Sequence, residues 1–332
     1  MAMEKRAISQ KLLNYLKPEK KEESNILKIV KHDRTLNIEF RGNRIIVYYR
    51  GCAILTVNET GSMKMNEKKY YSHDDKDGKK QYEIEQIKPT KENLDEYFMH
   101  AKLAIDKFNG YVKENAETET QQLIVKENNY SSVSNDTDYF IIDIEYKTPE
   151  GKEFDIIALN WESKSYDRSH PSPKNLGITV FELKYGCNAI GSGSKATSKK
   201  SASISDHLND YKNFVNGYPK EDFIEDMLMV FVQKCKLGLI EFGNSKNDHY
   251  KDLLNAEGKI KPEYSKIPLN FGYIFANYKP GSDVLRQQIE SIPKSEDFLY
   301  IESSFMGYGL YSNMIKHRIT AEYFEETLKK KK

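Results

Sequence analysis

Residues 178–185 read Ile-Thr-Val-Phe-Glu-Leu-Lys-Tyr, and this stretch decides the fold. Its β-branched and aromatic residues indicate a strand, and apolar residues on both faces are typical of a strand at the centre of a sheet. Because side chains alternate between the faces of a strand, Glu182 and Lys184 point to the same side. A carboxylate and an ammonium are costly in a buried run unless they share a task, so this pair is the first candidate for function.

A second acid lies in the apolar run of residues 153–159, which reads Glu-Phe-Asp-Ile-Ile-Ala-Leu and carries Asp155. Residues 139–146 form another strand-like run, and the Pro/Gly-containing segment 148–151 between the two runs is typical of a hairpin turn. A carboxylate from this hairpin, beside the carboxylate and ammonium of the next strand, would make a site for a hard divalent cation and an activated water. The three side chains together predict metal-dependent hydrolysis, with a phosphodiester as the substrate class.

Residues 94–128 predict one long helix that precedes the hairpin. Its apolar residues fall near one stripe at helical spacing: Ile105, Phe108, Val112, Ala116 and Leu123. Glu119 lies on this stripe, where an acid is unusual, whereas Glu117 points away from it. We therefore choose Glu119 as the helix acid and expect Gln122, one turn further on, to orient the site. A shifted helix phase would make Glu117 the helix acid instead.

The order of these elements resembles that of the PD-(D/E)xK nuclease superfamily: a helix with an acid, a hairpin with Asp155, a strand with Glu182 and Lys184, and a further helix from about residue 203. The resemblance covers roughly residues 105–305, and Phe154 stands where the family motif has its nominal Pro. It implies a restriction-endonuclease-like core, in which a central mixed sheet is flanked by helices. The expected fold class is α/β, of the α+β type with a mixed sheet.

The resemblance also implies a role for each candidate residue. Asp155, Glu182 and the backbone carbonyl of Leu183 would hold Mg²⁺ or Mn²⁺, and Lys184 would hold or help to deprotonate the attacking water. Glu119 would contact a metal-bound water or help to place a second ion. The expected activity is that of a Mg²⁺-dependent (deoxy)ribonuclease, an endonuclease for which DNA is favoured over RNA as the substrate. A restriction or antiviral defence role fits this class of enzyme.

Each residue also has a structural interpretation. Glu182 and Lys184 could form an exposed pair on a half-solvated strand, and Asp155 could be a surface acid near a turn. Asp143 and Glu145 share one face of the first hairpin strand, and we expect that face to be exposed to solvent, although Asp143 could approach the site from the hairpin. The alternative function is a catalytically silent nuclease-like domain that binds nucleic acid or a protein partner.

A Gly/Ser/Lys segment, residues 191–200, follows the decisive strand. Lys195, Lys199 and Lys200 supply positive charge that could meet the phosphates of a nucleic acid, although a solvated loop is an equally ordinary interpretation. His207 lies on the apolar face of the helix that follows, and we assign it to phosphate contact or structural support. A satisfied core histidine is the alternative at that position.

The N-terminal part of the chain predicts a small β-rich module, residues 1–100, ahead of a nuclease-like domain, residues 101–332. A short helix is expected at 7–16, followed by strand-like runs at 36–40, 44–49 and 52–57. The basic and aromatic residues between positions 41 and 57 could bind nucleic acid by charge and stacking. A plain sheet surface or an oligomer contact is the more ordinary interpretation.

The composition is that of an ordinary soluble protein. The 332 residues are 38% hydrophobic and 30% charged, and 51 basic residues balance 50 acidic ones, so global charge does not decide for or against a nucleic-acid partner. Three widely spaced cysteines argue against a disulfide framework or a zinc site. We expect a cytoplasmic protein without a membrane partner, because the sequence shows neither a long apolar run nor a signal peptide. A homo-oligomer and a regulatory protein partner are both left open.

Overall fold

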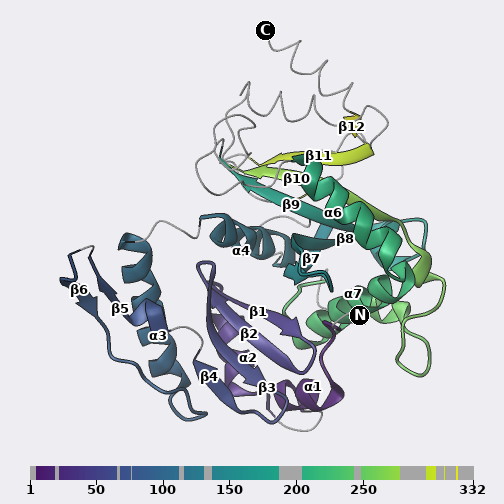
Figure 1. Ribbon diagram of the computed structural model, residues 1–332. Helices are drawn as coiled ribbons and strands as arrows, with labels where there is room; N and C mark the ends of the chain where they lie inside the picture. Colours follow the sequence, from purple (N-terminus) through teal and green to yellow (C-terminus); the bar gives the residue numbers. More distant parts are fainter. Residues whose placement is uncertain are drawn as a thin grey trace.

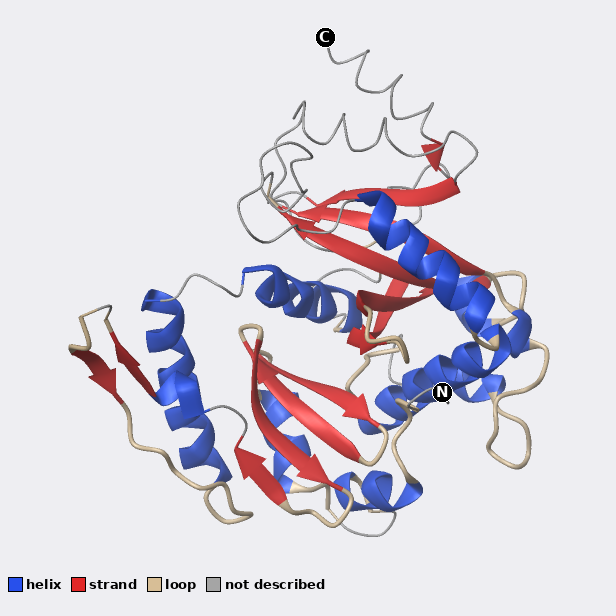
Figure 2. Cartoon of the chain, in the orientation of Figure 1, coloured by secondary structure: helices blue, strands red, loops and turns tan. Residues whose placement is uncertain are grey.

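The computed structural model describes residues 5–18, 22–65, 68–75, 77–111, 116–130, 137–186, 204–242, 248–276, 297–303, 310 and 319–320. These residues form an α+β arrangement of helices with antiparallel and mixed sheets (Figures 1 and 2). The α+β class expected from the sequence is therefore confirmed. No helix in the described ranges has the length and apolar character that crossing a membrane requires.

The N-terminal sheet is an antiparallel meander with the strand order β1-β2-β3-β4. Its strands are β1 (Leu36–Arg41), β2 (Arg44–Tyr49), β3 (Cys52–Asn58) and β4 (Met63–Met65), and the first three were predicted. The predicted first helix is α1 (Gln10–Leu16), which begins where the Ser9 side chain accepts the N–H of Leu12 at 3.2 Å. The second helix, α2 (Asn25–His32), was not predicted.

The predicted single helix over 94–128 is wrong, because the structure has two helices there. These are α3 (Leu94–Tyr111) and α4 (Ala116–Asn129). The buried side chains of α3 join the hydrophobic cluster of the N-terminal sheet, whereas Ile124 and Val125 of α4 join a separate cluster. Helix α3 also lies beside the small hairpin of β5 (Ser72–Asp74) and β6 (Lys80–Glu83), as Figure 1 shows. The predicted domain boundary at residue 100 therefore falls inside α3.

The main sheet is mixed and has the strand order β12-β11-β10-β9-β8-β7 among the described residues. Its strands are β7 (Tyr139–Lys147), β8 (Glu153–Trp161), β9 (Leu176–Tyr185), β10 (Leu269–Ala276), β11 (Asp297–Ser303) and β12 (Ile319–Thr320). Strand β8 pairs antiparallel with β7 and with β9, and β9 pairs in parallel with β10. The decisive stretch of the sequence is thus a central strand, as predicted, and all but the last of its residues are buried.

Helices cover both faces of this sheet around β9. Phe181 and Leu183 pack in one cluster with Ile124 of α4. On the other face, Val180 packs with side chains of α6 (Ile204–Gly217) and α7 (Lys220–Leu237), in the same hydrophobic cluster that contains the N-terminal sheet. The sequence predicts helices from about residue 203 and over 222–237, and these are α6 and α7. The short helix α5 (Ser165–Ser169) lies between β8 and β9. The sequence also predicts a helix over 283–289 and a frayed tail over 322–332, and both lie outside the described residues.

Buried charges join the N-terminal sheet to the main sheet. Asp143 of β7 is 1% exposed and pairs with Arg41 of β1 at 2.6 Å and with Arg6 at 3.2 Å. Glu39 of β1 pairs with Lys234 of α7 at 2.8 Å, and both side chains are almost fully buried. The expectation that Asp143 faces solvent was therefore wrong, because the N-terminal sheet packs over that face of β7.

Candidate active site

The site forms where strands β8 and β9 separate. Their pairing runs from Trp161–Leu176 to Ile156–Phe181 and ends there, while β8 stays paired with β7 as far as Glu153. Beyond that point the Asp155 Oδ2 atom accepts the backbone N–H of Leu183 at 2.7 Å, so a side chain replaces the missing strand partner. In a strand, the N–H and C=O of one residue point to the same neighbour. The Leu183 carbonyl therefore faces the same opening as Asp155.

Glu182 and Lys184 form a buried ion pair beside this opening. Lys184 Nζ donates to Glu182 Oε1 at 2.5 Å, and the two residues are 8% and 3% exposed. His207 of α6 places its Nδ1 atom 3.0 Å from the same oxygen. Burial lowers the pKa of His207 to about 3, and the charge of Lys184 adds to this effect, so the ring is neutral at pH 7. The other oxygen of Glu182, Oε2, is buried and has no hydrogen-bond partner among the described residues.

Helix α4 adds an amide and a third acid. Gln121 Nε2 donates to Asp155 Oδ1 at 3.2 Å, and the Gln121 Oε1 atom is buried without a hydrogen-bond partner in the described part of the chain. Glu117, one turn earlier, lies close enough for its charge to raise the pKa of Asp155 and of Glu182. Burial raises the pKa of Glu117 itself, although Lys184 and the backbone N–H of Tyr185 oppose that rise. The acid of α4 that faces the site is therefore Glu117.

Glu119 and Gln122, the residues chosen from the sequence, point away from Asp155 and toward the N-terminal sheet. Glu119 Oε1 accepts from Arg50 Nε at 2.8 Å, and Gln122 Oε1 accepts the backbone N–H of Gly51 at 3.0 Å. Both partners belong to the turn between β2 and β3. The choice of Glu119 as the helix acid is corrected for a physical reason: the stripe of α3 does not continue into α4, where Leu123 is 39% exposed.

The electrostatics of the site are dominated by crowded negative charge. Burial raises the pKa of Asp155 well above its usual range, and the charge of Glu182 raises it further. Burial likewise raises the pKa of Glu182 to about 7 against the opposing effect of Lys184. Burial alone would lower the pKa of Lys184, but the charges of Glu182 and Asp155 outweigh it and the pKa is raised. Three acids thus share one lysine, so an added cation would relieve their mutual repulsion.

The donor set fits a hard divalent cation. Two carboxylates and one backbone carbonyl offer only oxygen ligands and leave positions for water, as Mg²⁺ prefers. The buried, unpartnered Oε2 of Glu182 is the kind of atom that such an ion would satisfy. In the described ranges no three His, Cys, Asp or Glu side chains converge as metal ligands.

The predicted site residues thus divide into three groups. The structure brings together Asp155, Glu182, Lys184 and the backbone of Leu183. Glu119 lies apart from them, and the acid of α4 that faces the site is Glu117. His207 contacts Glu182, which fits the structural support assigned to it from the sequence. The predicted nucleic-acid contacts lie outside the described residues: Lys195, Lys199 and Lys200. Gln121 was not predicted. It lies one turn from Glu117 and three positions before the buried Ile124, so a helix phase that included Glu117 would also have included Gln121.

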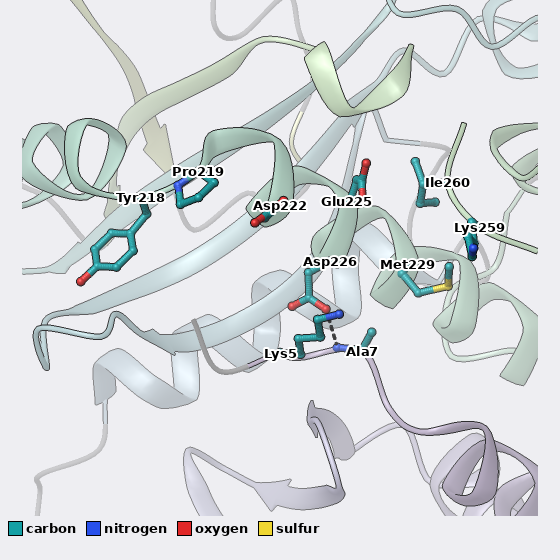
Figure 3. Close-up of a pocket in the computed structure, with 10 residues that line it drawn as sticks. All are labelled: Lys5, Ala7, Tyr218, Pro219, Asp222, Glu225, Asp226, Met229, Lys259 and Ile260. Carbon is teal, nitrogen blue, oxygen red and sulfur yellow. Dashed lines mark hydrogen bonds between the residues drawn. The ribbon is translucent and has the colours of Figure 1, made fainter. Parts of the chain in front are cut away.

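A pocket of about 690 Å³ lies elsewhere, where the N-terminal segment meets the start of α7 (Figure 3). Lys5, Ala7 and Asp222 are among the residues that line it, and Asp226 accepts the backbone N–H of Ala7 at 3.1 Å and of Arg6 at 2.6 Å. None of the residues that line this pocket belongs to the opening between β8 and β9. The pocket therefore accompanies the docking of the N-terminal segment on α7 and is not part of the candidate active site.

Comparison of the chain with protein-family models, with curated proteins and with solved structures finds no match.

Proposed function

We propose that this chain is a divalent-metal-dependent nuclease of the PD-(D/E)xK type that hydrolyses phosphodiester bonds, with DNA as the first candidate substrate. One observation carries the proposal. Asp155 and Glu182 meet where β8 and β9 separate, with Lys184 beside them, and Glu182 Oε2 is buried without a hydrogen-bond partner in the described part of the chain. Carboxylates crowded in this way are unfavourable for folding, and such groups are typical of functional sites.

The order of the elements supports the same proposal. Helix α4 is followed by the antiparallel strands β7, β8 and β9, then by α6, and then by β10, which is parallel to β9. A mixed sheet with helices on both faces is the core that the resemblance implies. Asp155 lies on β8 and the Glu182–Lys184 pair on β9, as the motif requires.

Each residue of the site has a role in the proposed reaction. Asp155, Glu182 Oε2 and the Leu183 carbonyl would hold Mg²⁺ or Mn²⁺, which when bound supplies positive charge for the phosphate and activates a water. Lys184 keeps its proton because its pKa is raised, so it serves as a hydrogen-bond donor and positive charge toward the phosphate or the attacking water. His207 Nδ1, which lies 3.0 Å from Glu182 Oε1, would help to hold that carboxylate when Lys184 interacts with the substrate.

The test is cleavage by the purified protein of linear, circular and single-stranded DNA and of RNA, with Mg²⁺, Mn²⁺ or EDTA. We expect metal-dependent cleavage that EDTA abolishes and that Lys184→Ala reduces by at least about a hundredfold. Lys64→Ala, on the exposed side of β4, is the matched lysine control and should cleave like the wild type. Cleavage by the Lys184→Ala protein at the wild-type rate would refute the role of Lys184. An absence of cleavage by the wild type in every condition would favour the silent, binding-only alternative.

A further inference from the structure

The turn between β2 and β3 touches the helix that carries Glu117 and Gln121. Arg50 and Gly51 form the turn between the paired residues Tyr49 and Cys52, and both have positive φ, 46° and 78°. A two-residue turn with this geometry is common in tight hairpins, but Arg is an unfavourable residue for it. An unfavourable backbone conformation persists only where the surrounding contacts hold it.

The contacts that hold this turn come from α3 and α4. Arg50 Nε is 2.8 Å from Glu119 Oε1 of α4, and Arg50 Nη1 is 2.9 Å from Asp106 Oδ1 of α3. The backbone N–H of Gly51 donates to Gln122 Oε1 of α4 at 3.0 Å. Arg50 therefore bridges two successive helices, and the hydrogen bond from Gly51 to Gln122 holds α4 one turn further along.

Gly51 also lies directly against the first turn of α4. A Cβ atom at this position would lie 2.4 Å from Thr118 Oγ1 and 2.8 Å from the backbone N of Glu119. Because the second of these atoms is backbone, a side chain at position 51 has to displace either the helix or the turn, and so changes how the two fit together. The residues touched, Thr118 and Glu119, adjoin Glu117, so the displacement would reach the site.

We infer that Arg50 and Gly51 are positioning residues, which set the rotation and depth of α4 so that Glu117 and Gln121 face Asp155 and Glu182. The phase of α4 supports this. Positions 117 and 121 share the face toward the main sheet, while 119 and 122 share the face toward the turn. The N-terminal module thereby becomes part of the catalytic unit, an inference that rests on the proposed nuclease function.

The test compares two glycine variants of the full-length protein. Gly51→Ala and Gly78→Ala carry similar backbone strain, since φ is 78° and 75°, but a Cβ atom at Gly78 meets nothing within 4 Å. We expect Gly51→Ala to speed amide hydrogen exchange in the first turn of α4 and to lower kcat about a hundredfold with KM within about twofold. Gly78→Ala should leave both quantities at their wild-type values.

Arg50→Ala provides a second variant, because it removes the bridge without adding an atom. It should speed exchange at the start of α4 and lower kcat about tenfold, again with little change in KM. Wild-type exchange in α4 together with wild-type kcat, in both Gly51→Ala and Arg50→Ala, would overturn the inference. If the wild-type protein cleaves no substrate, the proposed nuclease function fails, and the exchange of α4 in the same variants still decides the role of the turn.

Discussion

Replacing Glu182 by Gln should stabilise the protein while abolishing its activity. Three acids, Glu117, Asp155 and Glu182, crowd around Lys184 in a buried site, and the change removes one of the negative charges. Lys184 keeps two acids nearby as counter-charges, so the substitution leaves no unpaired cation. Residues that serve catalysis rather than folding are expected to behave in this way.

The magnitude follows from the pKa of Glu182. Its rise from 4.5 to about 7 corresponds to about 3 kcal/mol of unfavourable free energy when the carboxylate is ionised in the folded protein. Above pH 7 the group is ionised in both the folded and unfolded states, so the full penalty applies. Below pH 4.5 it is protonated in both states, and the penalty vanishes. Since Gln makes a weaker hydrogen bond to Lys184, we expect a net gain of about 1–3 kcal/mol at pH 8.

Urea unfolding in EDTA measures this gain. Trp161 is the only tryptophan and is fully buried, so its fluorescence should report the loss of the main sheet. The free energy of unfolding of the Glu182→Gln protein should exceed that of the wild type at pH 8, and the two should converge near pH 4.5. Added Mg²⁺ should stabilise the wild type and not the variant. Destabilisation by more than about 1 kcal/mol at pH 8, or a difference independent of pH, would show that the charge of Glu182 does not destabilise the folded protein.

Further substitutions separate the roles of the other charged groups and of His207. Glu117→Gln should weaken Mn²⁺ binding about tenfold, whereas Glu119→Gln, which keeps an acceptor for Arg50, should bind Mn²⁺ like the wild type in a calorimetric titration. Equal affinities for the two variants would contradict the assignment of Glu117. Lys234→Met should lower the free energy of unfolding by about 3–5 kcal/mol, because it leaves Glu39 buried without its lysine partner. Adding Glu39→Gln should restore most of that loss in urea unfolding, and no recovery would show that packing rather than charge is responsible. His207→Ala should lower the single-turnover cleavage rate about tenfold with metal affinity nearly unchanged, and a wild-type rate would remove His207 from the site.

The strands of the site could be predicted because each carries its own local signal. The run at 178–185 is apolar on both faces, and the hairpin at 139–161 has a Pro/Gly turn between two apolar runs. These local signals placed Asp155, Glu182 and Lys184 on two neighbouring strands. The order of the elements then brought the three residues into one predicted site. Their pairing geometry, including the bond from the Leu183 N–H to Asp155, follows from the end of the strand pairing and has no local signal.

The phase of α4 could not be predicted by extending the stripe of α3. The two helices pack against different clusters, so their buried faces are independent. A helical phase based on residues 120–128 alone would have identified Glu117 as the acid that faces the site. Gln121, Ile124 and Val125 are all buried, and Glu117 lies near the same face of the helix. Asp143 was misplaced for a related reason, because its partner Arg41 lies 102 positions earlier in the sequence.

The most direct test of the metal site is the position of Mn²⁺ in crystals of the wild-type protein, located by its anomalous scattering. We expect a peak in the opening between β8 and β9, within coordination distance of Asp155, Glu182 Oε2 and the Leu183 carbonyl, at about 2.1 Å for an ion of this type. The peak should be absent from crystals of the Asp155→Asn protein grown in the same way. A peak elsewhere, or no peak in this opening at saturating Mn²⁺, would contradict the account.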